Sequence, residues 1–182
     1  MNIKKWNARL SILTLALLLT HEAYQLYAYL TFYYNPTLSA VSGYTVAGAF
    51  VIHGALSLIC ITALHDAKGV AYKRLNLKTV IQRVSAVMIV LLLPLHIFSF
   101  STLQSSAGGV GYVLTEAAQI LFYGALSCHV ALSFSNALIT LGRLQDIKKK
   151  RVIDIIMIVF CAMLFLTASV IITSVHTKIF GI

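Results

Sequence analysis

The sequence is short of charged residues. Only 10% of its 182 residues are charged, and Asp and Glu together number five. A soluble domain carries roughly a quarter charged residues, so this chain has too little charge to coat a water-soluble globule. The scarcity excludes a soluble enzyme, a disordered chain and a soluble coiled coil, and it indicates an integral membrane protein.

Cysteine is also scarce, and all three cysteines lie inside apolar runs. Cys60, Cys128 and Cys161 therefore cannot cross-link exposed loops, and no Cys-x-x-Cys-His sequence is present for covalent haem attachment. We expect them to be small packing residues. The sequence has no internal repeat and no stretch suited to a soluble domain, so its chemistry must take place in the bilayer or on a bound partner.

Long apolar stretches make up most of the chain. A membrane-spanning helix needs about 20 predominantly apolar residues, and five stretches reach this length. They cover approximately residues 10–32, 44–65, 80–102, 114–141 and 153–176. The sequence predicts an all-α fold and one transmembrane domain over residues 1–182, in which the first four helices form an antiparallel bundle and the fifth supports it.

The basic residues fall on one side of the predicted helices. Thirteen of the 14 lie in the amino-terminal segment or in the second and fourth connections, whereas residues 31–43 and 101–113 contain none. Positive charge is retained on the cytoplasmic side, so we expect a cytoplasmic amino terminus and an external carboxyl terminus. The net charge of +9 is then a topology signal, and no nucleic-acid partner is expected.

Four of the six histidines lie deep within the predicted helices, one on each of the first four. They are His21, His53, His96 and His129. Each is 12 to 14 residues from a charged residue at the cytoplasmic boundary, or roughly 18–21 Å along a helix. We therefore expect all four in the middle of the membrane at matching depth. Ionisable groups there are costly to keep, which makes each a functional candidate.

Two imidazoles from different helices form a low-spin, electron-carrying haem site, so four histidines suit two haems. Zinc is a weaker candidate because it favours tetrahedral sites, often with thiolates. Pro94 is expected to kink or widen the third helix beside His96. Small residues near two of the histidines would leave space for a macrocycle, although they also suit ordinary helix packing. They are Ala49, Gly54, Gly124 and Ala125. The alternative is that the histidines are hydrogen-bonded core residues or members of a proton relay.

Short motifs resemble one family. The sequence Val-Ile-Gln-Arg-Val-Ser-Ala at 80–86, followed by His96, resembles a helix of succinate dehydrogenase cytochrome b subunits, with Ala86 where glycine is usual. Residues 128–136 resemble the fourth helix of that family, and Arg9-Leu10-Ser11 before His21 resembles its first. The similarity is to the type B di-haem membrane anchors of succinate:quinone and quinol:fumarate oxidoreductases, which have five helices.

The resemblance implies two haem b groups, one held by His21 and His96 and the other, nearer the cytoplasm, by His53 and His129. It implies a non-catalytic electron-transfer and quinone-reacting subunit of a succinate dehydrogenase/fumarate reductase in the respiratory chain and tricarboxylic acid cycle. The chain would lie in the inner (plasma) membrane, with flavoprotein and iron–sulfur subunits on the cytoplasmic side and menaquinone or ubiquinone in the membrane. Some quinol:fumarate members carry a glutamate where this sequence has Ser127, which argues against their proton path.

Other residues give weaker signals. Glu22, Gln25 and Glu116 are candidates for quinone binding and proton exchange near the external side, although Glu22 also suits a helix–helix hydrogen bond and Glu116 an interfacial position. The candidates for neutralising haem propionates, which equally serve as topology signals, are Arg9, Lys78 and Arg83. Two other functions remain open: a b-type anchor of another quinone-linked oxidoreductase, of the hydrogenase or formate dehydrogenase type, and a small proton-coupled transporter.

Overall fold

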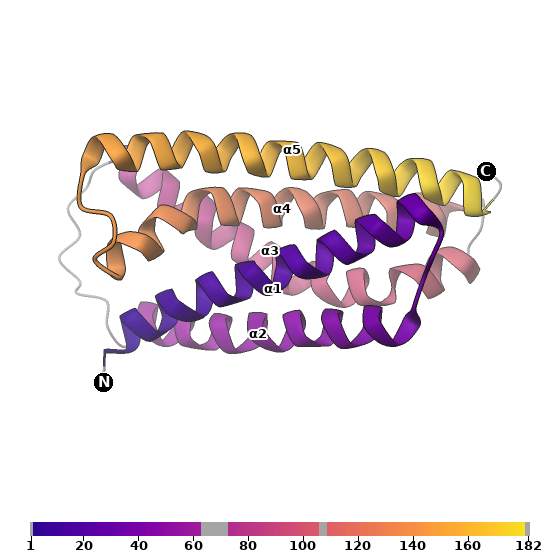
Figure 1. The fold of residues 1–182 in the computed structure, drawn as a ribbon, viewed down its shortest axis with the longest axis horizontal. Helices are drawn as coiled ribbons and strands as arrows, with labels where there is room; N and C mark the ends of the chain where they lie inside the picture. Colours follow the sequence, from indigo (N-terminus) through magenta and orange to yellow (C-terminus); the bar gives the residue numbers. More distant parts are fainter. Residues whose placement is uncertain (1, 63–72, 106–108, 181–182) are drawn as a thin grey trace. The chain divides into compact units, whose positions relative to one another are not determined.

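The described part of the chain is helical throughout. A computed structural model describes residues 2–62, 73–105 and 109–180, and these residues contain no strand. The helices, shown in Figure 1, are α1 (Ile3–Thr31), α2 (Pro36–Thr62), α3 (Lys73–Ser105), α4 (Val110–Thr140) and α5 (Ile147–Phe180). The all-α prediction is confirmed, and each predicted helix has a counterpart.

Four of these helices are long and apolar enough to cross a membrane. The qualifying segments are Pro36–Thr62, Leu77–Ser99, Val110–Thr140 and Ile147–Ser174. The α1 helix is not among them, because polar residues such as Thr20, His21, Glu22 and Gln25 interrupt its apolar run. A membrane protein is thus supported by four helices, whereas the fifth span and the orientation of the termini stay predictions.

The first connection is much shorter than the sequence pattern suggested. We expected a connection over 31–43, but α2 begins at Pro36. Asn35 caps the helix, since its Oδ1 accepts hydrogen bonds from the backbone N–H groups of Thr37 and Leu38 at 3.0 and 3.2 Å. Proline suits the first helical position because that residue needs no N–H donor. The predicted start of the second helix at residue 44 was wrong, because the first residues of α2 are partly polar and hydropathy does not register the Asn35 cap.

Two further expectations about the third and fourth helices can be compared with the structure. The fourth helix was predicted to begin near residue 114, but α4 begins at Val110 and includes Gly111. Residue 108 and most of the second connection, 63–72, lie outside the described residues. Pro94 lies inside α3, which continues through it to Ser105.

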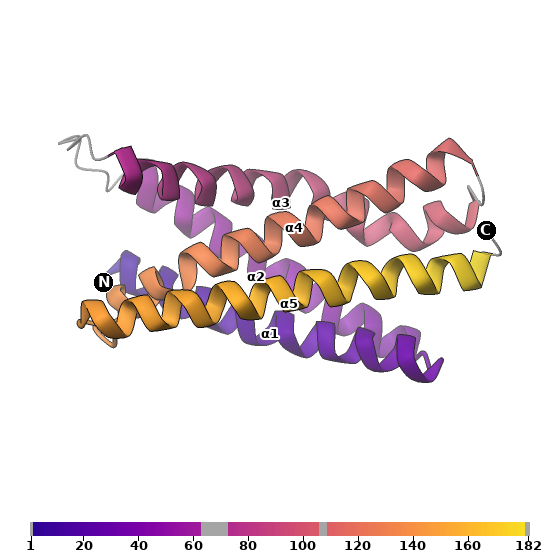
Figure 2. The same ribbon diagram turned by 90° about the horizontal axis from the view of Figure 1, so that it is seen from above.

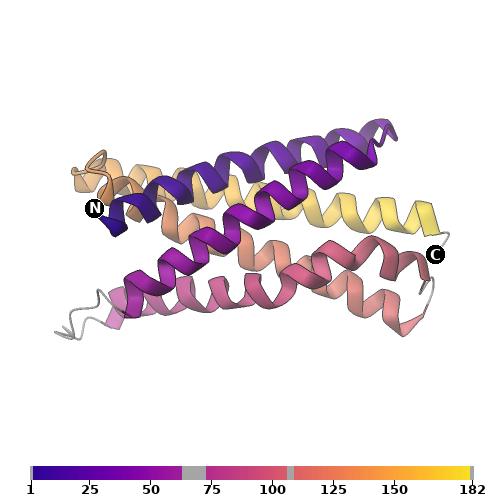
Figure 3. The ribbon, with the colours of Figure 1, turned by 90° about the horizontal axis from the view of Figure 1, so that it is seen from below.

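The contacts divide the chain into two compact units. The first unit comprises Met1–Ala71 and Phe134–Arg151, and the second comprises Tyr72–Ser133 and Val152–Ile182. In the first unit, α1 and α2 run side by side in opposite directions (Figures 1 and 3). A reciprocal pair near one end of this hairpin joins Asn7 to Ser57: Nδ2 of Asn7 donates to Oγ of Ser57 at 3.1 Å, and Oγ donates to Oδ1 at 3.3 Å.

The opposite end of the first hairpin is closed by a tyrosine. The hydroxyl of Tyr24 donates to the backbone carbonyl of Asn35 at 2.9 Å and accepts from its backbone N–H at 2.8 Å. Both polar backbone groups of this residue in the turn are thereby satisfied. The short connection is therefore held by a side chain of α1 itself.

The other part of the first unit is the turn between α4 and α5. Gly142 has a φ of +73°, and the N–H of Arg143 donates to the carbonyl of Leu138 at 2.9 Å. These are the features of a Schellman ending, which glycine permits because it has no Cβ. Asp146 then begins α5, since its Oδ1 accepts from the N–H of Lys148 at 2.7 Å.

The second unit contains most of α3, α4 and α5, which Figure 2 shows from another side. Hydrogen bonds between α3 and α4 establish that these helices are antiparallel, because His96 pairs with Gln119 and His129 with Gln82. The α5 helix packs on α4, where the ring of Phe165 lies against Gly124. Its buried residues Met157, Cys161 and Ile172 lie along one face, as expected of a supporting helix.

Candidate functional site

The first predicted ligand, His21, is buried in the α1–α2 hairpin. Its Nδ1 lies 2.9 Å from Oγ of Ser42 on α2, and its side chain is 8% exposed. The Ser42 hydroxyl oxygen also lies 3.1 Å from the carbonyl oxygen of Ser39, to which it can donate. With that hydrogen bond made, Oγ accepts from Nδ1 of His21, and the lone pair of the ring is on Nε2.

A glycine makes room for this imidazole. A Cβ placed on Gly43 would lie 3.4 Å from Cε1 and 3.9 Å from Nδ1 of His21. The contact at 3.4 Å is at the close end of van der Waals packing between carbon atoms. The hairpin therefore fits closely around the ring at this point, and a larger residue at 43 would move it.

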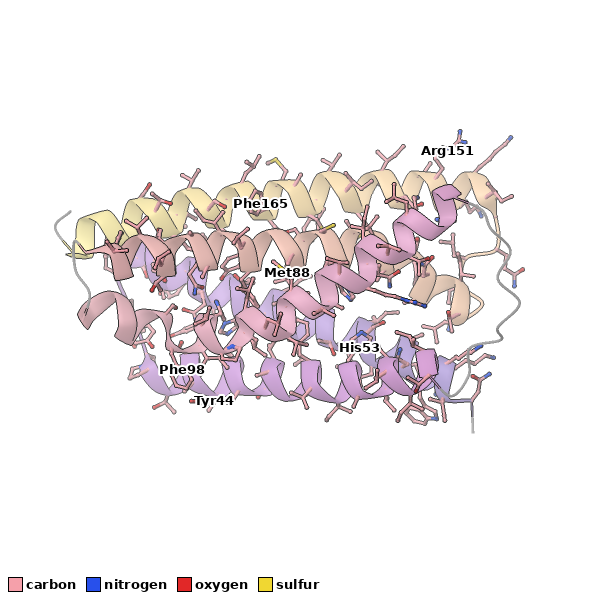
Figure 4. All side chains as sticks on the ribbon, turned by 180° about the vertical axis from the view of Figure 1, so that it is seen from behind. Tyr44, His53, Met88, Phe98, Arg151 and Phe165 are labelled. Atoms are coloured by element: carbon pink, nitrogen blue, oxygen red, sulfur yellow. The ribbon has the colours of Figure 1, made fainter. Side chains whose placement is uncertain are left out.

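The second predicted ligand, His53, lies on the same hairpin nearer its other end. It is half-buried and follows Ser42 by 11 residues, or about 16 Å along α2. It precedes Ser57, the partner of Asn7, by one turn. His53 and Tyr44, which projects outward from α2 with 66% of its surface exposed, are both labelled in Figure 4.

The third predicted ligand, His96, is held by three side chains of α4. Its Nδ1 lies 2.8 Å from Oε1 of Gln119. The ring of Phe122 stacks on the imidazole at 4.5 Å between centroids and 14° between planes. Tyr123 meets it edge-on at 5.8 Å. The imidazole is therefore fixed on one face and along one edge.

The fourth predicted ligand, His129, is oriented by the backbone of α3. Its Nδ1 lies 3.0 Å from the carbonyl oxygen of Gln82 and 3.4 Å from Oγ of Ser85. A carbonyl oxygen can only accept, so Nδ1 again carries the proton and Nε2 the lone pair. The same carbonyl also accepts from Ser85 Oγ at 3.0 Å.

Each unit holds its two histidines at two levels along the helices. In the first unit His21 lies level with Ser42, and His53 lies about 16 Å further along α2. In the second unit the His96–Gln119 contact and His129 are separated by ten residues of α4, or about 15 Å. On α3 the same two levels are marked by Gln82 and His96, which are 14 residues or about 21 Å apart. His21 and His96, the earlier histidine of each unit, lie nearer the turn of their hairpin, and these turns contain no basic residues.

The matching depth expected for the four histidines is therefore wrong within each unit. His129 pairs with Gln82, the neighbour of Arg83, whereas His96 lies 13 residues beyond that arginine. The expectation failed because Arg83 was used to mark the boundary of the membrane. It lies ten residues inside α3, where a long cationic side chain can extend toward water from a buried backbone.

The weaker quinone and proton candidates lie at different degrees of burial. Gln25 donates from Nε2 to Oγ of Ser39 at 2.8 Å, one turn from His21 on the same hairpin. Glu22 is half-buried in α1. Glu116 is buried in α4, with 9% of its surface exposed, and lies one turn from Gln119. Its burial favours a functional or packing role over the interfacial position considered for it.

The basic candidates for propionates are exposed. The guanidinium of Arg9 lies 5.2 Å from the ring centroid of Trp6 and two residues from Asn7, so it belongs to the His53 end of the first hairpin. Arg83 is next to Gln82, the partner of His129, and Lys78 lies about one turn nearer the start of α3. In each unit an arginine thus lies near the histidine of the more basic end.

Small residues near the histidines play different parts. A Cβ at Gly54 would meet nothing within 4 Å, whereas one at Gly124 would lie 3.5 Å from Phe165. Gly124 therefore lies at the contact between α4 and α5, which is the helix-packing role open to it from the sequence. Ala49 is buried and Ala125 half-buried. Within the described residues, no three His, Cys, Asp or Glu side chains gather as a zinc site would require.

The partners of the histidines were missed in the sequence. Ser42, Gln119 and Phe122 were not singled out, nor were Gln82 and Ser85 in this role. The available signal was the antiparallel arrangement itself. Counting equal numbers of residues outward from the turn brings Gln119 opposite His96, since each lies nine residues from its end of the second hairpin. The same count does not find Ser42, because His21 lies ten residues before the end of α1 and Ser42 only six after the start of α2.

Comparisons with known proteins give no match: no family model matches the sequence, and neither a curated protein nor a solved structure is similar to it. The resemblance to succinate dehydrogenase anchors accordingly depends on the short motifs around Arg9, Gln82 and His129.

Proposed function

We propose that the chain is a di-haem cytochrome b membrane anchor that passes electrons between a cytoplasmic iron–sulfur partner and a membrane quinone. The observation that carries this proposal is the same arrangement within each unit: one histidine lies toward the hairpin end that lacks basic residues, and the other lies toward the more basic end. The family resemblance then assigns His21 and His96 to one haem, and His53 and His129 to the other.

The chemical state of the imidazoles fits axial ligation. Haem iron takes a neutral imidazole through a nitrogen lone pair, and the other ring nitrogen commonly donates to an oxygen acceptor. His96 and His129 each have such an acceptor at Nδ1, which leaves the lone pair on Nε2. His21 has the hydroxyl oxygen of Ser42 at its Nδ1, which can serve in the same way. Bound haem would supply one-electron transfer, while these residues orient the imidazoles and set their basicity.

The remaining roles are proposed from position. Arg9 and Arg83 lie near the histidines of the basic ends and suit the carboxylates of propionates. Gln25, Glu22 and Glu116 lie toward the opposite ends of their hairpins, where a quinone exchanges protons with water. The complex would be a succinate:quinone oxidoreductase or quinol:fumarate reductase of the plasma membrane, with its flavoprotein and iron–sulfur subunits on the cytoplasmic side.

The deciding experiment is a dithionite-reduced minus oxidised spectrum of the purified chain, with a haem-to-protein ratio. We expect Soret and α bands of haem b and a ratio near two. A ratio near one means that two of the four histidines have another function. A colourless protein, after reconstitution with protoporphyrin IX iron, excludes the proposal and favours the proton relay of a transporter, since hydroxyl and amide partners suit that function as well. Subunits that copurify distinguish succinate dehydrogenase from a hydrogenase or formate dehydrogenase.

A further inference from the structure

Gln119 occupies an unusual position on α4. It is 3% exposed, and its carboxamide bridges two consecutive residues of α3. Oε1 lies 2.8 Å from Nδ1 of His96, and Nε2 donates to the backbone carbonyl of Leu95 at 3.3 Å. A buried polar side chain in a membrane helix is costly unless its groups are paired. Both ends of this amide are paired with the same turn of α3.

The second contact determines which way the amide points. The Leu95 carbonyl can only accept, so the NH₂ group of Gln119 must face it and Oε1 must face His96. A flipped amide would place two oxygens against each other at Leu95. Since Oε1 can only accept, the proton of the imidazole is held on Nδ1. Gln119 therefore selects the tautomer of His96.

The aromatic rings packed around His96 do not decide between the two orientations of its imidazole, so the hydrogen bond to Gln119 does. Phe122, one turn from Gln119 on α4, covers a face of the imidazole, and Tyr123 meets its edge. Stacking fixes the plane of the ring, but both 180° ring orientations satisfy it. The hydrogen bond to Gln119 separates them, because only one directs Nδ1 at Oε1 and Nε2 away from it.

We propose that Gln119 is a positioning residue for His96, which aims the Nε2 lone pair and sets the basicity of the imidazole toward the iron bound there. This inference depends on the proposed function. An acceptor at Nδ1–H makes the imidazole a stronger donor and stabilises the ferric state. A side chain, that of Gln119, would thus set the basicity of His96 toward a bound haem, whereas the backbone carbonyl of Gln82 would do so for His129.

The test uses Gln119→Leu, which keeps the size of the side chain but removes the acceptor. Gln145→Leu is the control, because it removes a carboxamide at an exposed position between α4 and α5. Both are measured in the purified complex by low-temperature EPR of the ferric haems and by redox titration. In Gln119→Leu we expect one low-spin EPR signal to shift and the potential of that haem to rise, with the other haem unchanged. In Gln145→Leu both signals stay at their wild-type positions.

Two further variants separate positioning from packing. Gln119→Glu keeps the length of the side chain and an acceptor oxygen. The potential of the haem at His96 should therefore be no higher than in the wild type, in contrast to Gln119→Leu. Gln119→Asn is one methylene shorter, so the EPR signal and potential of the same haem should shift in the direction seen in Gln119→Leu. If Gln119→Leu fails to assemble, the Asn variant tests the inference in its place. Two haems with wild-type spectra and potentials in both Gln119→Leu and Gln119→Asn overturn the inference. A wild-type protein without haem overturns the proposed function instead.

Discussion

His21 and Ser42 meet across the α1–α2 hairpin, with Nδ1 of the imidazole 2.9 Å from the serine hydroxyl oxygen. The next residue on α2, Gly43, packs directly against the same ring. The position of this histidine is therefore determined by two neighbouring residues, one through hydrogen bonding and the other through its lack of a side chain.

The Gly43 contact predicts a site-specific effect of added volume. Gly43→Val should displace the His21 ring and destabilise the protein by about 1–3 kcal/mol, the usual cost of overpacking. It should also lower the content of the haem bound at the His21 level. Thermal unfolding in detergent and the haem-to-protein ratio measure the two effects. Gly48→Val is the control, since a Cβ at Gly48 meets nothing within 4 Å. Equal effects of the two substitutions would show that the space at Gly43 is unimportant.

The pairing of the histidines predicts which substitutions act on the same haem. His53→Ala and His129→Ala should each remove one and the same low-spin EPR signal and lower the haem ratio from about two to about one, because a bis-imidazole iron loses its low-spin character when either ligand is removed. His21→Ala and His96→Ala should remove the other signal. If His53→Ala and His96→Ala instead abolish a common signal, the assignment of the pairs is wrong.

The Asn7–Ser57 pair predicts a measurable coupling between α1 and α2. Its two hydrogen bonds are reciprocal, so either alanine substitution removes both. A double-mutant cycle of Asn7→Ala and Ser57→Ala should give a coupling of about 0.6 kcal/mol or somewhat more, the value typical of interhelical hydrogen bonds in membranes. Unfolding in mixed detergent micelles provides the free energies. Strictly additive effects would mean that the two side chains stabilise the hairpin independently.

The number of membrane crossings can be tested at the two termini. Four helices qualify as spans by length and hydropathy; if α1 also crosses, the termini lie on opposite sides. A reporter that is fluorescent only in the cytoplasm should be active at the amino terminus, and one that folds only outside should be active at the carboxyl terminus. A cytoplasmic reporter inserted at Gly142 serves as the internal standard. Termini on the same side would remove α1 from the membrane-spanning set.

The sequence predicted the helices well because hydropathy depends on composition over many residues. It predicted the boundary of α2 poorly, since Asn35 and Pro36 start a helix through a local cap that hydropathy does not register. It also placed four histidines on four helices correctly but assigned them a common depth. Their levels depend on which residues face each other across a hairpin, and this is visible only once Ser42 and Gln119 are seen beside His21 and His96.

The residues that orient the histidines could not be predicted by considering one helix at a time. Ser42, Gln82 and Gln119 are ordinary polar residues whose significance comes from a neighbour on the adjacent helix. Gln82 was noticed as part of a motif, yet its backbone oxygen is the atom that contacts His129. No side-chain pattern could have indicated that acceptor.

The hydrogen bonds between α1 and α2 have a consequence for the insertion of the chain into the membrane. The α1 helix is synthesised before α2, but the hydrogen-bond partners of its Gln25, His21 and Asn7 side chains belong to α2; they are Ser39, Ser42 and Ser57. Alone in lipid, α1 would expose an amide and an imidazole; beside α2, it buries them. The hairpin as a whole, and not its leading helix, is then the smallest piece of the nascent chain that can leave the translocon for the bilayer.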